Sequence, residues 1–176
     1  EILGKLALSE LIAKGNFEEV SKRAFRIISK TNLVFPNESM ALKDGLSDPE
    51  KLKTFALSLN DLLYSEVELK LRVESFIELL EQIGAAKWTI LTYFLFIGFP
   101  DRFLFLKPIA SKQATEVFAF DIKYKPELNW NTFKAHQDFG DYLYSELYKQ
   151  GSPIRPKDMI DVQGFIYCVS KLYKKK

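Results

Sequence analysis

The stretch Trp88–Pro108 reads WTILTYFLFIGFPDRFLFLKP, and it is the most apolar and aromatic run in the chain. Its first half, from Trp88 to Phe99, carries no charge, and its apolar side chains fall on every side of a helical projection. Because such a helix is buried on most sides, we expect a central core helix at about residues 87–98. The run is shorter than the roughly 20 apolar residues that a membrane span needs, and Pro100 stops it.

The second half of the stretch, Pro100–Pro108, places Asp101, Arg102 and Lys107 in an otherwise apolar segment. The residues from Arg102 to Lys107 predict either a short strand or an extended buried crossing. A single strand without a partner would not make a sheet. Any function carried by the stretch should therefore lie in this charged half, and Lys107 is the first residue to test.

The rest of the chain predicts helices, because apolar residues recur at helical spacing and strand-like alternation is almost absent. Start signals include Asn16, Ser47 before Asp48-Pro49, and Ser65 with Glu68 three residues on. The predicted helices are Ile2–Ala13, one capped by Asn16, Glu38–Lys43, Ser47 to about Tyr64, Ser65 to about Ile83, Ser111 to about Phe120, Asn129 or Asn131 to Gln150, and Lys157 to about Tyr173. Their inward positions include Val67, Leu71, Val117 and Ile160. We predict an all-α fold, a single-domain multi-helix bundle over residues 1–176 around the central helix.

Composition is that of a globular chain, with 47% hydrophobic and 27% charged residues among 176. A single cysteine excludes an intramolecular disulfide and agrees with a cytoplasmic protein. We expect that residue, Cys168, to be a small buried hydrophobe, with a reactive thiol as the alternative.

The net charge of +2 comes from the C-terminal tail. Four of the 25 basic residues lie in KLYKKK, which leaves 21 basic against 23 acidic residues in the body. A dedicated duplex-DNA binder usually has a stronger basic excess, although a local basic patch stays possible. We expect no membrane partner.

Chemistry-bearing motifs are sparse. His136 is the only histidine, so a zinc site or a histidine-dependent triad has little to build on, and we expect a surface or hydrogen-bonded role for it. Nucleotide-binding, P-loop and common metal motifs are missing, and we expect neither a metal nor a cofactor. Asp158 and Asp161 share a helix face, as an acid/base couple or, in the reading that we favour, as charges at a helix N-terminus.

Two groups of basic residues have open interpretations. Lys107, Lys112, Lys123 and Lys125 lie near Tyr124 and Trp130 in the sequence. Interleaved cations and aromatics can bind single-stranded nucleic acid, but Trp130 in the core with solvated lysines is the simpler reading. Lys22, Arg26 and Lys30 recur every four residues, as a solvated helix face or as an anion-binding face.

Four motifs resemble a family of uncharacterised bacterial proteins that share versions of TNLLFSFEKMALRD, PDRHxFLKP, PNWxTY and PRDMIDVQSFIW in this order. Here they read TNLVFPNESMALKD (31–44), PDRFLFLKP (100–108), NWNTF (129–133) and RPKDMIDVQGFIY (155–167). The resemblance covers about residues 16–168, with departures at Leu128, Phe133 and Gly164. It implies a bacterial protein that is part of a longer chain, because members carry an additional N-terminal segment, and it brings no activity with it.

A weaker resemblance is to the helix-hairpin-helix DNA glycosylases. It rests on IGAAKWTILTYFLF (83–96) followed by FLKPIASKQATEVF (105–118). The catalytic aspartate of that family falls on Lys107, which cannot act as a carboxylate but could attack a sugar carbon. The tight Gly-x-Gly turn of the hairpin reads Gly84-Ala85-Ala86 here. The resemblance implies a glycosylase-like arrangement of the helices.

Two functions follow as expectations. The first is a non-enzymatic helical module that binds a protein or a nucleic acid, and its candidate binding residues are Lys107, Arg102, Lys112, Asn129, Trp130 and Arg155. The alternative is an enzyme that acts on DNA bases, for which the candidate catalytic residues are Lys107, Asp101, Asp158 and Asp161.

Overall fold

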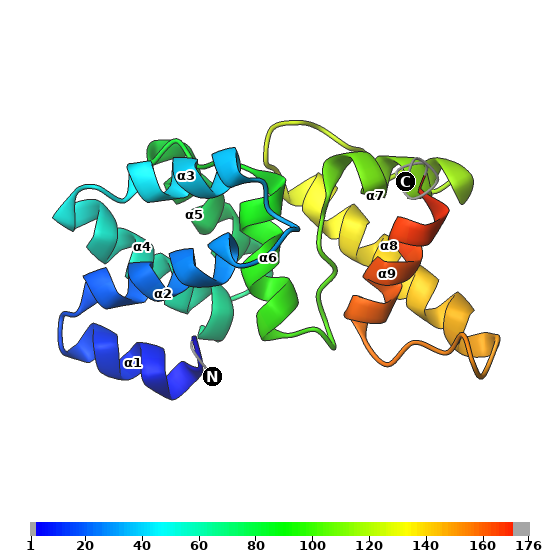
Figure 1. Ribbon diagram of the computed structural model, residues 1–176, viewed down its shortest axis with the longest axis horizontal. Coiled ribbons are helices and arrows are strands. Elements are labelled where there is room, and N and C mark those ends of the chain that lie inside the picture. Colours follow the sequence, from blue (N-terminus) through cyan, green and yellow to red (C-terminus); the bar gives the residue numbers. More distant parts are fainter. Residues whose placement is uncertain (1–2, 171–176) are drawn as a thin grey trace. The chain divides into compact units, whose positions relative to one another are not determined.

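The computed structural model describes residues 3–170, and within them every regular element is an α-helix. Figure 1 shows these helices in chain order. They are α1 (Lys5–Ala13), α2 (Phe17–Ser29), α3 (Pro36–Gly45), α4 (Pro49–Tyr64), α5 (Leu69–Gln82), α6 (Trp88–Gly98), α7 (Pro108–Val117), α8 (Trp130–Lys149) and α9 (Met159–Val169). The prediction of an all-α fold is confirmed. Ile2, the lysine tail and the expected last turn up to Tyr173 lie outside the described residues.

The chain divides into two compact units, Glu1–Phe94 (unit 1) and Leu95–Lys176 (unit 2). The resemblance to the helix-hairpin-helix glycosylases and the expectation of a single domain both stay predictions. No helix within residues 3–170 is long and apolar enough to cross a membrane.

Helix α6 is the predicted central helix, and its side chains are buried from Trp88 to Phe96. In unit 1, the Phe94 ring lies 6.4 Å from the rings of both Phe55 and Phe76, centroid to centroid. In unit 2, the Phe96 ring lies 5.8 Å from that of Phe105. One helix therefore contributes core aromatics to both units, which explains why it is apolar all round.

Unit 1 is organised by α4, which packs against α1, α2 and α5, while α2 also packs against α3. The C-terminal end of α3 approaches the end of α5 closely at Gly45. A Cβ atom at this position would clash with the carbonyl oxygen of Ile83. Because only glycine permits this approach, Gly45 fixes the position of the residues on either side of it, Lys43 to Leu46.

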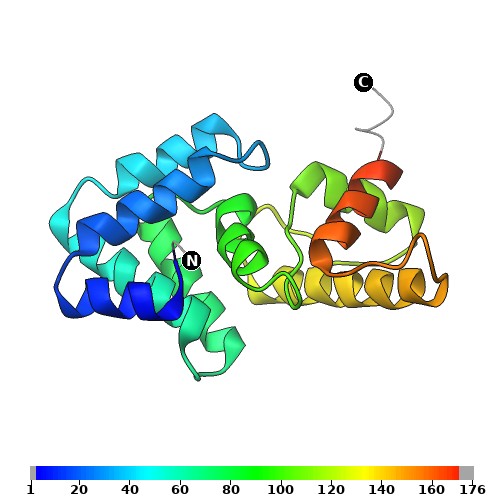
Figure 2. The same ribbon diagram turned by 60° about the horizontal axis from the view of Figure 1, so that its bottom comes forward.

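In unit 2, α7 and α9 lie on the same side of the long helix α8 (Figure 2). The segment Phe103–Leu106 is buried and forms neither helix nor strand, which confirms the extended crossing. The side-chain amide of Gln137 takes the place of a neighbouring strand. Its Oε1 accepts a hydrogen bond from Leu104 N at 2.7 Å, and its Nε2 donates to Leu104 O at 3.1 Å.

The predicted start of α5 at Ser65 is wrong. Ser65 is instead the C-cap of α4, with its N–H donating to Asp61 O, and its side chain accepts a hydrogen bond from Val67 N. Helix α5 begins only at Leu69. Val67 and Leu71 are therefore 52% and 55% exposed, against the prediction that both are buried.

Three further burial predictions are wrong for geometric reasons. Val117 is the last residue of α7 and Ile160 lies in the first turn of α9, and both are exposed. Cys168 is also exposed, because the buried face of α9 runs through Met159, Val162, Gln163 and Ile166. At the start of α4 the N-cap is Asp48, one residue after the predicted Ser47.

Candidate functional site

Lys107 does not project into solvent. It is 7% exposed and occupies the N-cap position of α7, where its carbonyl oxygen accepts a hydrogen bond from Ser111 N at 2.8 Å. The enzyme alternative would have been excluded if Lys107 projected into solvent away from any cleft. Because Lys107 is buried, this observation does not exclude that alternative.

The two predicted arginines lie over aromatic rings near them in the chain. The guanidinium of Arg102 is 5.3 Å from the ring centroid of Phe103. That of Arg155 is 3.8 Å from the ring of Tyr148 and also donates a hydrogen bond to its hydroxyl. Both arginines and the adjacent Asp101 are exposed.

Asn129 and Trp130 shape the start of α8. Asn129 Oδ1 accepts a hydrogen bond from Thr132 N at 2.8 Å, and Thr132 Oγ1 donates to Lys123 O at 2.7 Å. Trp130 is half-buried and stacks on Phe133, with 5.6 Å between ring centroids. These contacts hold the preceding connector against the helix start.

Asp158 and Asp161 bind backbone N–H groups at the start of α9. Asp158 Oδ1 accepts from Ile160 N, and Asp161 Oδ2 accepts from Lys157 N, each at 2.8 Å. The structure thus places both carboxylates in the helix-terminus role that the sequence favoured.

Lys112 borders a shallow cleft of about 330 Å³ in unit 2. Its Nζ lies 5.1 Å from the ring centroid of Tyr124, which pairs a cation with an aromatic ring as the sequence suggested. Glu116 and Asp121 line the same cleft and offset the positive charge. Burial, together with the charge of Glu127, raises the pKa of Tyr124.

His136 is fully buried and hydrogen-bonded, with its Nε2 3.0 Å from Ser111 Oγ. Burial lowers the pKa of His136 to about 3, so the ring is neutral at physiological pH. Its Nδ1 has no hydrogen-bond partner among the described residues. The His136 side chain is therefore a neutral, buried polar group in the core of unit 2, where it is hydrogen-bonded to Ser111.

A larger cleft, of about 480 Å³, lies in unit 1, and we call it the α2–α3 cleft. Helices α2 and α3 run side by side in Figure 1 and Figure 2. The cleft is lined by Glu18, Ser21, Lys22, Phe25, Lys43, Asp44, Leu46, Ser47 and Leu52. Three of these are apolar, four are charged and two are serines, so the cleft has apolar walls and more polar residues than binding pockets usually have.

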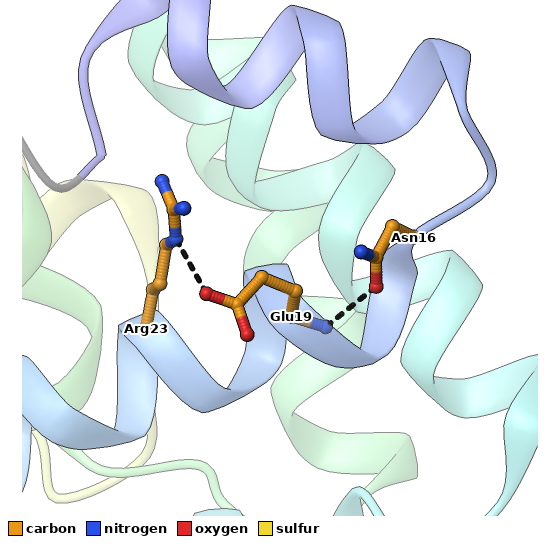
Figure 3. Close-up of polar contacts among 3 residues, drawn as sticks. All are labelled: Asn16, Glu19 and Arg23. Carbon is orange, nitrogen blue, oxygen red and sulfur yellow. Dashed lines mark hydrogen bonds and ion pairs between the residues drawn. The ribbon is translucent and has the colours of Figure 1, made fainter.

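The first turns of α2 are held in place by the contacts drawn in Figure 3. Asn16 Oδ1 accepts a hydrogen bond from Glu19 N at 3.3 Å, as the predicted cap requires. Glu19 Oε1 then pairs with Arg23 Nε at 2.8 Å, one turn further on. These contacts lie on the helix segment that presents Ser21 and Lys22 to the cleft.

Charged residues on the rim differ in how they are paired. Glu18 and Lys22 form an exposed ion pair at 2.8 Å, and the hydrogen bond between them lowers the pKa of Glu18 and raises that of Lys22. Lys43 instead lies with its Nζ 5.7 Å from the ring centroid of Phe25. The Phe25 ring is half-buried, so the ammonium group of Lys43 stands over an apolar wall of the cleft.

Sequence reasoning found only one residue of this cleft. Lys22 belongs to the stripe for which an anion-binding face was left open, whereas Arg26 and Lys30 do not line the cleft. Lys43 and Ser21 carried no signal of their own, because the cleft forms only when α2, α3 and the start of α4 come together.

Comparison of the chain with protein-family models, with curated proteins and with solved structures finds no match. The resemblance to the bacterial family therefore stays a prediction from the four motifs.

Proposed function

We propose that the chain is a non-enzymatic helical module that binds a segment of a partner protein in the α2–α3 cleft. The observation that carries this proposal is the lining of the cleft, where the apolar side chains of Phe25, Leu46 and Leu52 lie among charged and hydroxyl side chains. Burial against these three apolar side chains favours association with an apolar side chain of a partner, and the polar groups around them fix its orientation.

Binding is favoured over catalysis by what two of the four candidate catalytic residues already do, and by the state of the only histidine in the sequence. Asp158 and Asp161 are engaged as acceptors at the start of α9. His136 is buried and its depressed pKa keeps it neutral, so it is a poor candidate for exchanging protons with a substrate.

A protein partner is favoured over nucleic acid by the local charge. The rim of the α2–α3 cleft has two lysines and two carboxylates, and the cleft beside Lys112 has two carboxylates among its lining residues. Phosphate backbones are bound by an excess of cations, which neither cleft has.

A random peptide library displayed on phage provides the test. We expect peptides that contain apolar residues to be enriched on the wild-type chain and to lose binding to Leu52→Lys, which places a charge in the cleft. Leu57→Lys is the matched control, because Leu57 is an exposed residue of the same helix that does not line the cleft. Equal binding to both variants would contradict the proposal.

Retardation of DNA provides the competing outcome. If single-stranded DNA is shifted at low salt, and Lys112→Ala abolishes the shift while Leu52→Lys leaves it intact, the nucleic-acid alternative is favoured instead.

A further inference from the structure

Ser21 has an unusual environment for a serine in a helix. It lines the α2–α3 cleft and is 5% exposed, yet its Oγ has no hydrogen-bond partner among the described residues. A buried hydroxyl without a partner costs stability, so such a group in a cleft points to a ligand that would satisfy it.

Five other helical hydroxyls show the usual solution, although Thr89 Oγ1 on α6 lacks a hydrogen-bond partner among the described residues, as Ser21 Oγ does. They donate to a carbonyl oxygen three or four residues earlier in their own helix, at 2.8 to 3.3 Å. The pairs are Ser29 with Arg26, Ser39 with Pro36, Thr54 with Glu50, Thr92 with Trp88, and Thr115 with Lys112. Ser21 makes no such bond. Its Oγ is itself covered in the described structure, so a ligand group reaches the hydroxyl by displacing the atoms that cover it.

Of the two lysines that line the cleft, Lys43 is the one without an ion-pair partner among the described residues. No carboxylate of the described residues lies within ion-pair distance of its Nζ, whereas the charge of Lys22 is offset by Glu18. The ammonium group stands over the Phe25 ring, where it remains exposed and can meet an anion. Its neighbour Asp44 is also on the rim and, like Lys43, has no ion-pair partner among the described residues. Consecutive helical residues point about 100° apart, so one ligand group meets one of the two, and an acidic group is attracted to Lys43.

We infer that the partner segment is acidic: it places an apolar side chain against Phe25, Leu46 and Leu52, a carboxylate at Lys43, and a hydrogen-bond acceptor at the hydroxyl of Ser21. This inference rests on the proposed function and adds the chemistry of the partner to it. The arrangement joins an apolar anchor to two polar contacts of different kinds, which gives the cleft a preferred direction for the bound segment.

Three capped peptides test the charge. The probes are acetyl-Gly-Asp-Leu-Asp-Gly-amide and its counterparts with asparagine or lysine in place of both aspartates, titrated into the full chain and followed by NMR shifts of cleft residues. We expect the aspartate peptide to bind most tightly, and Lys43→Met to weaken it about three- to fivefold, as for an exposed ion pair. Lys43→Arg should restore the affinity. Lys53→Met, which removes an exposed lysine that does not line the cleft, should leave it unchanged.

Ser21→Ala separates a binding role from a structural one. Removing an unpartnered buried hydroxyl should raise the melting temperature, while the affinity for the aspartate peptide falls about three- to tenfold through the lost hydrogen bond. A structural serine would instead lower the melting temperature and leave the affinity unchanged.

The outcomes distinguish the inference of an acidic partner from the proposed function as a binding module. If the lysine peptide binds best and Asp44→Asn weakens it while Lys43→Met does not, the acidic partner is ruled out but the binding module stands. If no peptide shifts cleft residues and the phage library yields none that Leu52→Lys abolishes, both proposals fall.

Discussion

At Gly45, the absence of a Cβ atom allows the end of α3 to pack against the end of α5 in unit 1. The sequence marks this glycine only as the end of a predicted helix, because a C-terminal glycine is common. In the structure its role is steric, since an added Cβ would lie 3.0 Å from the Cβ of Ile83 and clash with the Ile83 carbonyl oxygen. The partner is an isoleucine far along the chain, and for that reason local sequence could not reveal the contact.

His136 should make the stability of unit 2 depend on pH. Its pKa is about 3 in the folded chain and near 6.5 when unfolded, so the unfolded chain binds the proton more readily between these values. The contribution is therefore intact above about pH 6.5 and is lost as the pH falls toward about 3. We expect the free energy of unfolding to decrease by up to about 1.4 kcal/mol per pH unit in this window.

Urea denaturation of wild-type and His136→Gln chains between pH 7 and pH 5 measures this effect, because few carboxylates titrate there. Glutamine keeps a polar group beside Ser111 Oγ and cannot take up a proton. The variant should lose most of the pH slope. Parallel slopes for the two chains would mean that another group is responsible.

Helix starts show which elements the sequence can locate. Asn16 was predicted correctly as a cap, because the contact to Glu19 N spans only three residues. The similar signal at Ser65 was misleading, since the preceding helix had already taken that residue as its C-cap. A local motif thus predicts a helix start well only where no neighbouring element competes for the same residue.

The segment from Arg102 to Lys107 was predicted as a short strand or an extended buried crossing. The sequence did not show which groups would hydrogen-bond its backbone. Gln137, on α8, supplies both the donor and the acceptor for Leu104. Gln137→Leu keeps the size of the side chain and leaves two backbone groups without partners. We expect a loss of about 2–6 kcal/mol in the free energy of unfolding, at about 1–3 kcal/mol for each group.

Hydrogen exchange at the Leu104 amide gives a second readout for this variant. The amide should lose more protection than those in the middle of α8, because its acceptor is removed directly. Gln137→Glu is the matched control, since a carboxylate still accepts from Leu104 N but cannot donate to Leu104 O. Unchanged protection in Gln137→Leu would contradict the assigned role.

Across the whole molecule, the fold class followed from periodicity and the α2–α3 cleft did not. The apolar run of α6 identifies a core helix from sequence alone, because burial on all sides leaves a continuous apolar pattern. A cleft leaves no such pattern. Its residues are partly polar and partly apolar, and they come from α2, α3 and the start of α4, so Ser21 and Lys43 became candidates only through their three-dimensional surroundings.

The position of α6 leads to a prediction about how the stability of each unit changes when one of its core phenylalanines is removed. Phe94 packs with Phe55 and Phe76 in unit 1, while Phe96, two residues on, packs with Phe105 in unit 2. Phe94→Ala and Phe96→Ala remove rings of equal size from the same helix. Each should cost about 3–5 kcal/mol in the unit whose core it enters.

Native-state hydrogen exchange resolves the two effects residue by residue. Phe94→Ala should accelerate exchange most in α4 and α5, and Phe96→Ala most in α8, if each unit opens as its own cooperative body. Each variant serves as the other's control, because the helix and the type of substitution are the same. Equal acceleration in both units by both variants would instead show that residues 3–170 unfold as one, with α6 as the shared core.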